Sequence, residues 1–108
     1  MQPALTEAVY YILLSLLEPL HGYGIMQNAE QLSGGRIRLA AGTLYGALNT
    51  LLEKGWIRAL PETGDSRNKK EYIITDMGRT VLAAELARLT ELAENGKRIL
   101  TEKGTERK

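Results

Sequence analysis

Hydrophobic residues recur at helical spacing in the first third of the chain. In residues 5–17 they lie three or four positions apart, and Pro19 stops the pattern. The same spacing returns in residues 23–32 and stops at Gly34 and Gly35, because paired glycines suit a helix C-terminus. These patterns predict two amphipathic helices, the first of them buried.

Two further stretches have the same periodicity. Residues 41–54 place their leucines along one stripe and stop at Gly55. The stretch from Asp76 to about residue 102 is longer and takes Thr75 or Asp76 as its N-cap. Its apolar residues approximate a short seam that would pair two helices, and this seam consists of Leu82, Leu86, Leu89, Ala93, Gly96 and Leu100.

The remaining segments favour extended structure. Residues 56–60 and 72–74 are rich in β-prone side chains and flank a long polar stretch, so they predict a hairpin with a basic tip. Segment 36–39 alternates polar and apolar residues, so it is either a short strand or an extended linker. The predicted order is helix, helix, short strand, helix, hairpin, helix. This is a mainly α-helical fold with a small β-hairpin.

Composition excludes several classes of protein. The chain has 108 residues, 44% of them hydrophobic, which is enough for one core. It has no cysteine, so disulfides, a thiolate nucleophile and a cysteine-based zinc site are excluded. One histidine and scattered acids offer no acid–base pair and no metal set, so we expect no enzyme, metal or other cofactor. No secretory signal or membrane span is apparent, so a cytoplasmic protein without membrane contact is expected.

Positive charge is concentrated in the middle of the chain. The net charge of +1 says little by itself. However, residues 1–33 contain no Lys or Arg, whereas residues 34–70 contain seven against three acids. A polyanion could be held by phosphate contacts in this region.

The predicted helix 41–54 has a small, polar face opposite its leucine stripe. Polar side chains there can hydrogen-bond to base edges, and glycines leave room for a duplex to approach. Gly46 costs the helix about 1 kcal/mol relative to alanine, so something other than helix stability favours it. Simple solvent exposure would also explain this face, but a helix beside a basic hairpin suits the major groove. The residues assigned to bases are Gly42, Thr43, Gly46, Asn49 and Thr50.

The hairpin tip supplies the candidates for phosphate contact, which are Arg67, Lys69 and Lys70. Long, flexible cations suit this role because phosphate binding needs charge more than a fixed geometry. An ordinary solubilising loop is the alternative interpretation. Tyr45 lies at the edge of the apolar stripe. Its hydroxyl either reaches a phosphate or its ring packs under the hairpin.

Four sequence blocks, taken in order, resemble the signature of PadR-like transcriptional regulators. They are HGYGI at 21–25, GTLYGAL at 42–48, LEKGWI at 52–57 and KEYIITDMG at 70–78. The match covers residues 5 to about 80, and the joint spacing of the blocks is specific. The chain departs from many relatives in having a hairpin tip poorer in Gly, Arg and Pro, and in having Gly46 where proline is frequent.

The resemblance implies a winged helix-turn-helix domain, expected at 1–75, then a dimerisation helix at 76–102 and a flexible tail at 103–108. It implies a homodimeric repressor that binds double-stranded operator DNA, expected to be palindromic, and that a small effector releases. Some members of the family bind planar aromatic compounds. The dimer would form through the C-terminal and first helices, at Leu5, Val9, Leu82, Leu86, Leu89, Ala93 and Leu100.

Three aromatic residues are candidates for such an effector site, because aromatic faces stack on planar ligands. They are Tyr10, Tyr11 and Trp56, for which core or dimer packing is the alternative. His21 lies at a helix junction, where a structural hydrogen bond is expected. A protein interaction module without DNA binding is the second interpretation of the whole chain, because a fold does not fix a function. The basic hairpin tip favours DNA.

Overall fold

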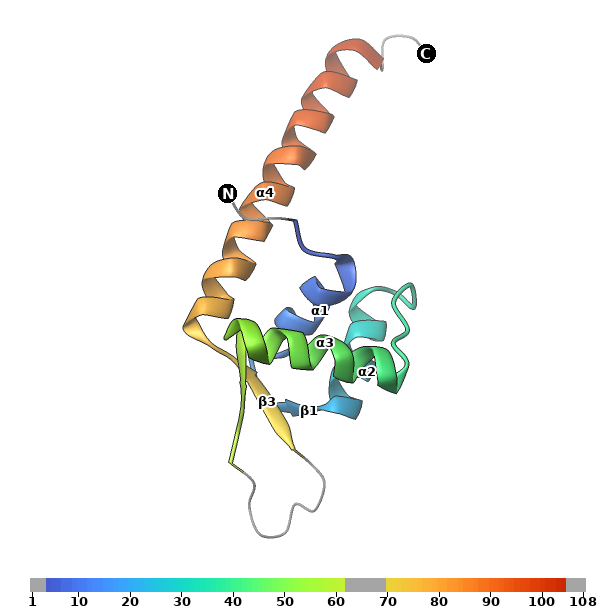
Figure 1. Ribbon diagram of the computed structural model, residues 1–108. Coiled ribbons are helices and arrows are strands. Elements are labelled where there is room, and N and C mark those ends of the chain that lie inside the picture. Colours follow the sequence, from blue (N-terminus) through green and yellow to red (C-terminus); the bar gives the residue numbers. More distant parts are fainter. Residues whose placement is uncertain (1–3, 62–69, 105–108) are drawn as a thin grey trace.

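The computed structural model describes residues 4–61 and 70–104 of the chain. Helices α1 (Glu7–Ser15), α2 (Gly22–Leu32) and α3 (Ala41–Lys54) pack together, and the long helix α4 (Asp76–Ile99) extends away from them (Figure 1). A short π-helical segment, Leu100–Gly104, continues α4. The predicted mainly α-helical fold is therefore confirmed, and α3 has the predicted bounds.

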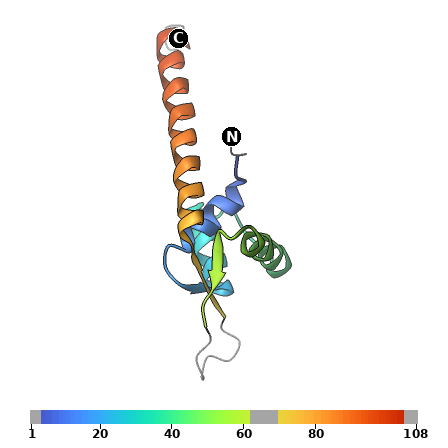
Figure 2. The same cartoon turned by 60° about the vertical axis from the view of Figure 1, so that its left-hand side comes forward.

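A small antiparallel sheet completes the fold. It contains β1 (Leu20–His21), β2 (Ile57–Ala59) and β3 (Glu71–Ile74), with β3 in the centre. Ile57 is paired with Ile74 and Ala59 with Tyr72, so β2 and β3 form the predicted hairpin. Figure 2 shows this hairpin and the far end of α4 at opposite ends of the molecule.

The helices begin and end at residues whose chemistry explains the boundary. Thr6 caps α1 and Thr75 caps α4, each by accepting a backbone N–H with its side chain. His21 caps α2, because its Nδ1 accepts the N–H of Gly24 at 3.1 Å. Helix α3 ends at Gly55, whose φ of 77° lies in the left-handed region that glycine adopts readily. The expected structural role of His21 is confirmed.

One hydrophobic core joins the helices to the sheet. Its side chains come from the inner faces of α1, α2 and α3, from alternate residues of β3, and from the first turns of α4. Burying each large aliphatic side chain stabilises the fold by about 1.5 to 3 kcal/mol. The fully buried large residues are Ile12, Leu13, Leu16, Ile25, Leu44, Leu48, Leu51 and Ile57.

The structure decides between the two interpretations of segment 36–39 and places the short strand elsewhere in the chain. The strand lies before α2, where Leu20 and His21 pair with the edge of β3. Two residues are too few to show an alternating pattern, so the strand is determined by its partner. Segment 36–39 is instead the extended linker, and Ser33 holds it by accepting the N–H of Ile37 at 2.8 Å.

The turn into α4 is bonded to the turn that follows α3. The Thr75 hydroxyl donates to the carbonyl of Gly55 at 2.6 Å, and its N–H donates to the carbonyl of Trp56 at 2.9 Å. Gly78 lies directly against the Trp56 carbonyl. A Cβ on Gly78 would clash with that oxygen and would lie 2.7 Å from Cγ1 of Ile74. The direction of α4 relative to α3 therefore depends on a residue without a side chain.

A buried acid connects α4 to the N-terminal segment. Glu85 is only 3% exposed, and its carboxylate accepts the N–H of Leu5 at 3.3 Å. Arg88 donates to the same carboxylate at 3.0 and 2.6 Å. The hydrogen bond from Arg88 lowers the pKa of Glu85, burial opposes this, and the bond from Leu5 lowers it further. Beyond Glu85, the described residues of α4 are exposed except for the half-buried Arg88.

No helix in residues 4–61 or 70–104 is long and apolar enough to cross a membrane. The exposed part of α4 carries Leu86, Leu89 and Leu92 at intervals of three, and charged residues lie between them.

We expect the substitution Gly78→Ala to lower the free energy of unfolding by about 2 to 3 kcal/mol, because two of the three nearest atoms belong to the Trp56 backbone and cannot move aside cheaply. Chemical denaturation measures this change. Gly46→Ala is the matched control, since a Cβ at Gly46 meets no described atom within 4 Å. This control should gain up to about 1 kcal/mol from helix propensity. Equal effects of the two substitutions would contradict the close contact at Gly78.

The Glu85 carboxylate should make stability depend on pH. Its pKa in the folded protein lies below the ordinary value of 4.5, so its contribution is present above that pH and is lost as the pH falls through the folded pKa. The difference in unfolding free energy between wild type and Glu85→Gln should therefore be largest near neutral pH and shrink below about pH 4.5. Glu94→Gln, at an exposed position on the same helix, is the control. A difference that stays constant across this range would refute the assignment.

Candidate nucleic-acid interface

Helix α3 turns its leucines inward and a small, polar face outward. Leu44, Leu48 and Leu51 are buried. All five residues assigned to base contacts are exposed, and a Cβ at Gly42 or Gly46 would meet no described atom within 4 Å. Packing within the chain therefore does not require these glycines. The structure brings together, on one face of one helix, Gly42, Thr43, Gly46, Asn49 and Thr50.

The first turn of α3 has no side-chain cap. Ala40 occupies the N-cap position and makes no side-chain hydrogen bond to the N–H groups that follow it. Such N–H groups need a partner, and an anion at a helix N-terminus satisfies them. On the same helix, the Thr50 hydroxyl donates to the carbonyl of Gly46 at 3.2 Å, which leaves its oxygen able to accept. The polar face thus offers both donors and acceptors.

Tyr45 packs against the start of α2, a position that the sequence did not indicate. Its hydroxyl and the adjoining ring carbon lie so close to Gly22 that a Cβ there would clash with both. The ring is 45% exposed. Tyr72 of β3 is buried, and its pKa is raised mainly by burial and further by the neighbouring Tyr45. Tyr45 therefore lies where α2, α3 and the hairpin meet.

Only part of the predicted hairpin lies within the described residues. Arg67 and Lys69 lie outside the described residues. Lys70 is exposed just before β3, and Arg58 is exposed on β2. These two side chains place positive charge on the hairpin.

Two other arginines of the basic middle region form ion pairs. Arg36 binds Glu7 at 2.5 Å, and the hydrogen bond with this carboxylate raises its pKa. Arg38 lies 3.4 Å from Glu30. Both pairs are largely exposed, so solvent screens them and they add little to the stability of the fold. They do, however, neutralise charge on the linker between α2 and α3.

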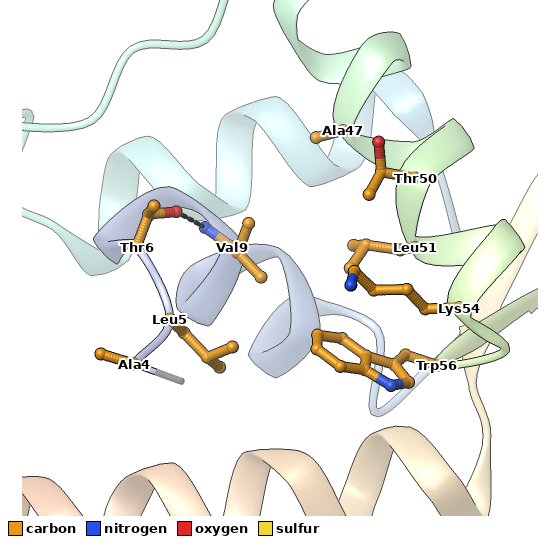
Figure 3. Close-up of a pocket in the computed structure, with 9 residues that line it drawn as sticks. All are labelled: Ala4, Leu5, Thr6, Val9, Ala47, Thr50, Leu51, Lys54 and Trp56. Carbon is orange, nitrogen blue, oxygen red and sulfur yellow. Dashed lines mark hydrogen bonds between the residues drawn. The ribbon is translucent and has the colours of Figure 1, made fainter. Parts of the chain in front are cut away.

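Two cavities flank the segment Ala4–Thr6 and divide the aromatic candidates between them. One, of about 310 Å³, is bounded by this segment, α1, α3 and Trp56 (Figure 3). The other, of about 340 Å³, is lined by Tyr10 and Tyr11 together with residues of α4. The two tyrosine rings meet edge to face with centroids 5.9 Å apart. The three aromatic residues therefore do not form a single site.

The residues expected at a dimer interface have unequal exposure. Leu82 is 8% exposed and belongs to the core of the chain, so little of it is left for a partner. This corrects the start of the predicted seam, because the first two turns of α4 pack inward. Leu5 and Val9 are half-buried against the core. The predicted interface positions still exposed are Leu86, Leu89 and Ala93 on α4, and Leu100 in the π-helical segment that follows it.

Comparison with known sequences identifies relatives. A family model described as the transcriptional regulator PadR-like family matches residues 12–84. An uncharacterised 37.1 kDa protein in transposon TN4556 of Streptomyces fradiae is 39% identical over 88 residues, which are 81% of this chain and 24% of that protein. The chain thus spans about a quarter of the length of this relative.

Solved structures have the same fold. A PadR family transcriptional regulator from Eggerthella lenta is 29% identical, with a TM-score of 0.69 over 85% of this chain and 80% of that one. Bacillus subtilis PadR, solved in complex with operator DNA, is 27% identical, with a TM-score of 0.59 over 72% of this chain and 46% of that one. The resemblance predicted from the four sequence blocks is confirmed, and the chain belongs to the PadR-like family of transcriptional regulators.

Proposed function

We propose that the chain is a sequence-specific DNA-binding regulator, acting as a homodimer, that places α3 in the major groove. The exposed polar face of α3 carries the proposal. Gly42 and Gly46 leave open space on this face, while Thr43, Asn49 and Thr50 offer hydrogen-bonding groups. The relative from Bacillus subtilis, which was solved with operator DNA, supports the choice of DNA over a protein partner.

The hairpin, as the wing, would hold the DNA backbone beside α3. Lys70 and Arg58 are exposed on it, and Arg67 and Lys69 belong to the same proposed set from sequence. Tyr45, half exposed at the junction of α2 and the hairpin, would contact a phosphate with its hydroxyl. Cations that contact phosphates add affinity for any duplex, so the bases must be read by α3.

A second copy of the chain would cover the exposed apolar residues of α4 and of the π-helical segment that continues it. Leu86 and Leu92 are each 54% exposed and Leu100 is 66% exposed, which is costly for a helix that stays alone in water. Pairing through α4 and α1 gives a two-fold dimer, so the operator would be palindromic with half-sites about 10 bp apart or a multiple of it. Repression would follow from occupying a promoter. A small effector in one of the two cavities would release the DNA.

The DNA model is tested by selecting a preferred duplex from a random library and then measuring affinity by fluorescence anisotropy. Asn49→Ala should weaken binding to the selected duplex by about tenfold or more, because one pair of base contacts is lost. It should leave binding to a scrambled duplex unchanged. Lys70→Ala should weaken both equally and reduce the slope of log affinity against log salt by about one unit.

Asn95→Ala is the matched control, since Asn95 is exposed on α4 and contacts Arg98 of the same helix. It should change neither affinity. If wild-type binding shows no decline with rising salt, the phosphate-contact model is wrong. If no duplex is selected at all, the protein interaction module becomes the better interpretation.

Leu86→Asp should convert the dimer into monomers in sedimentation experiments, because an unpaired charge in an apolar interface is strongly unfavourable. Leu86 is more than half exposed in the single chain, so the substitution should leave the fold intact. Ala84→Asp introduces the same charge at an exposed position roughly 200° around the helix and should leave the dimer unchanged. A dimer that survives Leu86→Asp would remove this residue from the interface.

A further inference from the structure

The cations proposed to contact phosphates all belong to the hairpin, which follows the C-terminal end of α3 (Figure 1). Helix α3 has 14 residues and is therefore about 21 Å long, so its N-terminal end lies far from these cations. The major groove is about 12 Å wide, and a helix inside it has a phosphate backbone on each side. If the hairpin holds one backbone, the other needs cations from elsewhere in the chain.

Few residues can supply a cation near the N-terminal end of α3. Residues 1–53 contain two basic side chains, Arg36 and Arg38, and both belong to the linker that leads into this helix. Arg38 comes two residues before Ala40, the N-cap of α3, so its Cα lies within about 7 Å of the start of the helix. These two arginines are therefore the candidates for contact with the second backbone.

The two arginines are held to different degrees. Arg36 donates to the carboxylate of Glu7 from Nε at 2.8 Å and from a terminal nitrogen at 2.5 Å. Nε of Arg38 lies 3.4 Å from a carboxylate oxygen of Glu30, which is longer than an ordinary N–H···O hydrogen bond. Two short, charge-assisted bonds fix Arg36 to α1, whereas a single long contact between exposed groups is easily exchanged.

The side chain of Arg38 folds back over the end of α2. Its partner Glu30 belongs to the last turn of that helix, and a Cβ on Gly35, just beyond the helix, would lie 3.8 Å from a terminal nitrogen of Arg38. The side chain is 74% exposed. A long, exposed arginine has many rotamers, so it can turn toward the first turn of α3 without a change in the backbone.

We propose that Arg38 exchanges Glu30 for a backbone phosphate when DNA binds, while Arg36 stays on Glu7. This inference rests on the proposed function, because it concerns the second backbone beside α3. A phosphate offers the guanidinium two oxygens that match its fork geometry, and its neutralisation releases counterions from the duplex. Glu30 is therefore an internal competitor of the phosphate, and it lowers the affinity for every duplex alike.

Anisotropy titrations at several salt concentrations, with the selected and the scrambled duplex, test the contact with phosphate. Arg38→Gln should weaken binding to both duplexes equally and reduce the slope of log affinity against log salt by about one unit. Arg38→Lys should keep the wild-type slope, because phosphate contact needs charge more than a fixed geometry. Arg36→Gln is the matched control. It removes the same charge from the same linker and should leave the slope unchanged.

Glu30→Gln measures the competition between the carboxylate and the phosphate. It should strengthen binding to both duplexes about two- to fivefold, which is the range for releasing one exposed ion pair. A general change in protein charge would have the same effect with or without Arg38. Because the proposed gain comes through Arg38, Glu30→Gln should have little effect in a chain that already carries Arg38→Gln.

The outcomes separate this inference from the proposed function. If wild type binds DNA with the expected salt dependence but Arg38→Gln keeps its slope, the exchange is wrong and the proposed function stands. Equal losses of slope in Arg36→Gln and Arg38→Gln would also overturn the exchange, because they indicate a general effect of charge. An equal gain from Glu30→Gln with and without Arg38 would remove Glu30 as the competitor. If wild type binds no duplex, the proposed function fails and this inference fails with it.

Discussion

The contact between the turn after α3 and the turn before α4 determines the geometry of the rest of the molecule. Thr75 bonds to the carbonyls of Gly55 and Trp56, and Gly78 lies against the second of these carbonyls. All of the partners on the α3 side are backbone atoms, which have little freedom to move. The helix with the polar face and the helix with the exposed apolar residues are therefore held in one fixed relation. Any dimer built through α4 would transmit that relation to the spacing of two α3 helices.

The sequence predicts those elements that are long enough to repeat their hydrophobic pattern several times. Helix α3 shows its leucine stripe over three turns, and its bounds could be predicted closely. Strand β1 consists of Leu20 and His21 alone, so its own residues carry no period, and only pairing with β3 creates it. The alternation in segment 36–39 allowed either a strand or an extended linker, and without a neighbouring strand to pair with the segment forms a linker.

Parts of the candidate site depend on contacts between distant segments, which no local pattern records. The polar face of α3 was predictable because it is the reverse of the leucine stripe. The two cavities could not be predicted from the sequence, because each depends on where the segment Ala4–Thr6 crosses the helices. Glu85 did leave a signal, since it is an acid four residues after the buried Val81 on the inward side of α4. Leu82 was predicted to lie at the dimer interface, but it is buried in the core of the chain. The pattern of apolar residues continues without a break from core positions into exposed ones, so the sequence alone could not separate them.

Helix α4 extends far beyond the contacts that fix its direction, so a small rotation at these contacts moves its far end appreciably (Figure 1). Helix α4 is held at its start by the contact at Gly78 and further along by Glu85, and the 14 residues beyond Glu85 span about 21 Å. A rotation of about 5° at Glu85 would displace the end of α4 by about 2 Å, which is more than half of the rise between adjacent base pairs. In the proposed dimer, a displacement of this size would change the separation of the two α3 helices by an amount that matters for their register on a duplex. A substitution at the turn that contains Gly78 would therefore change this separation without altering either α3 helix.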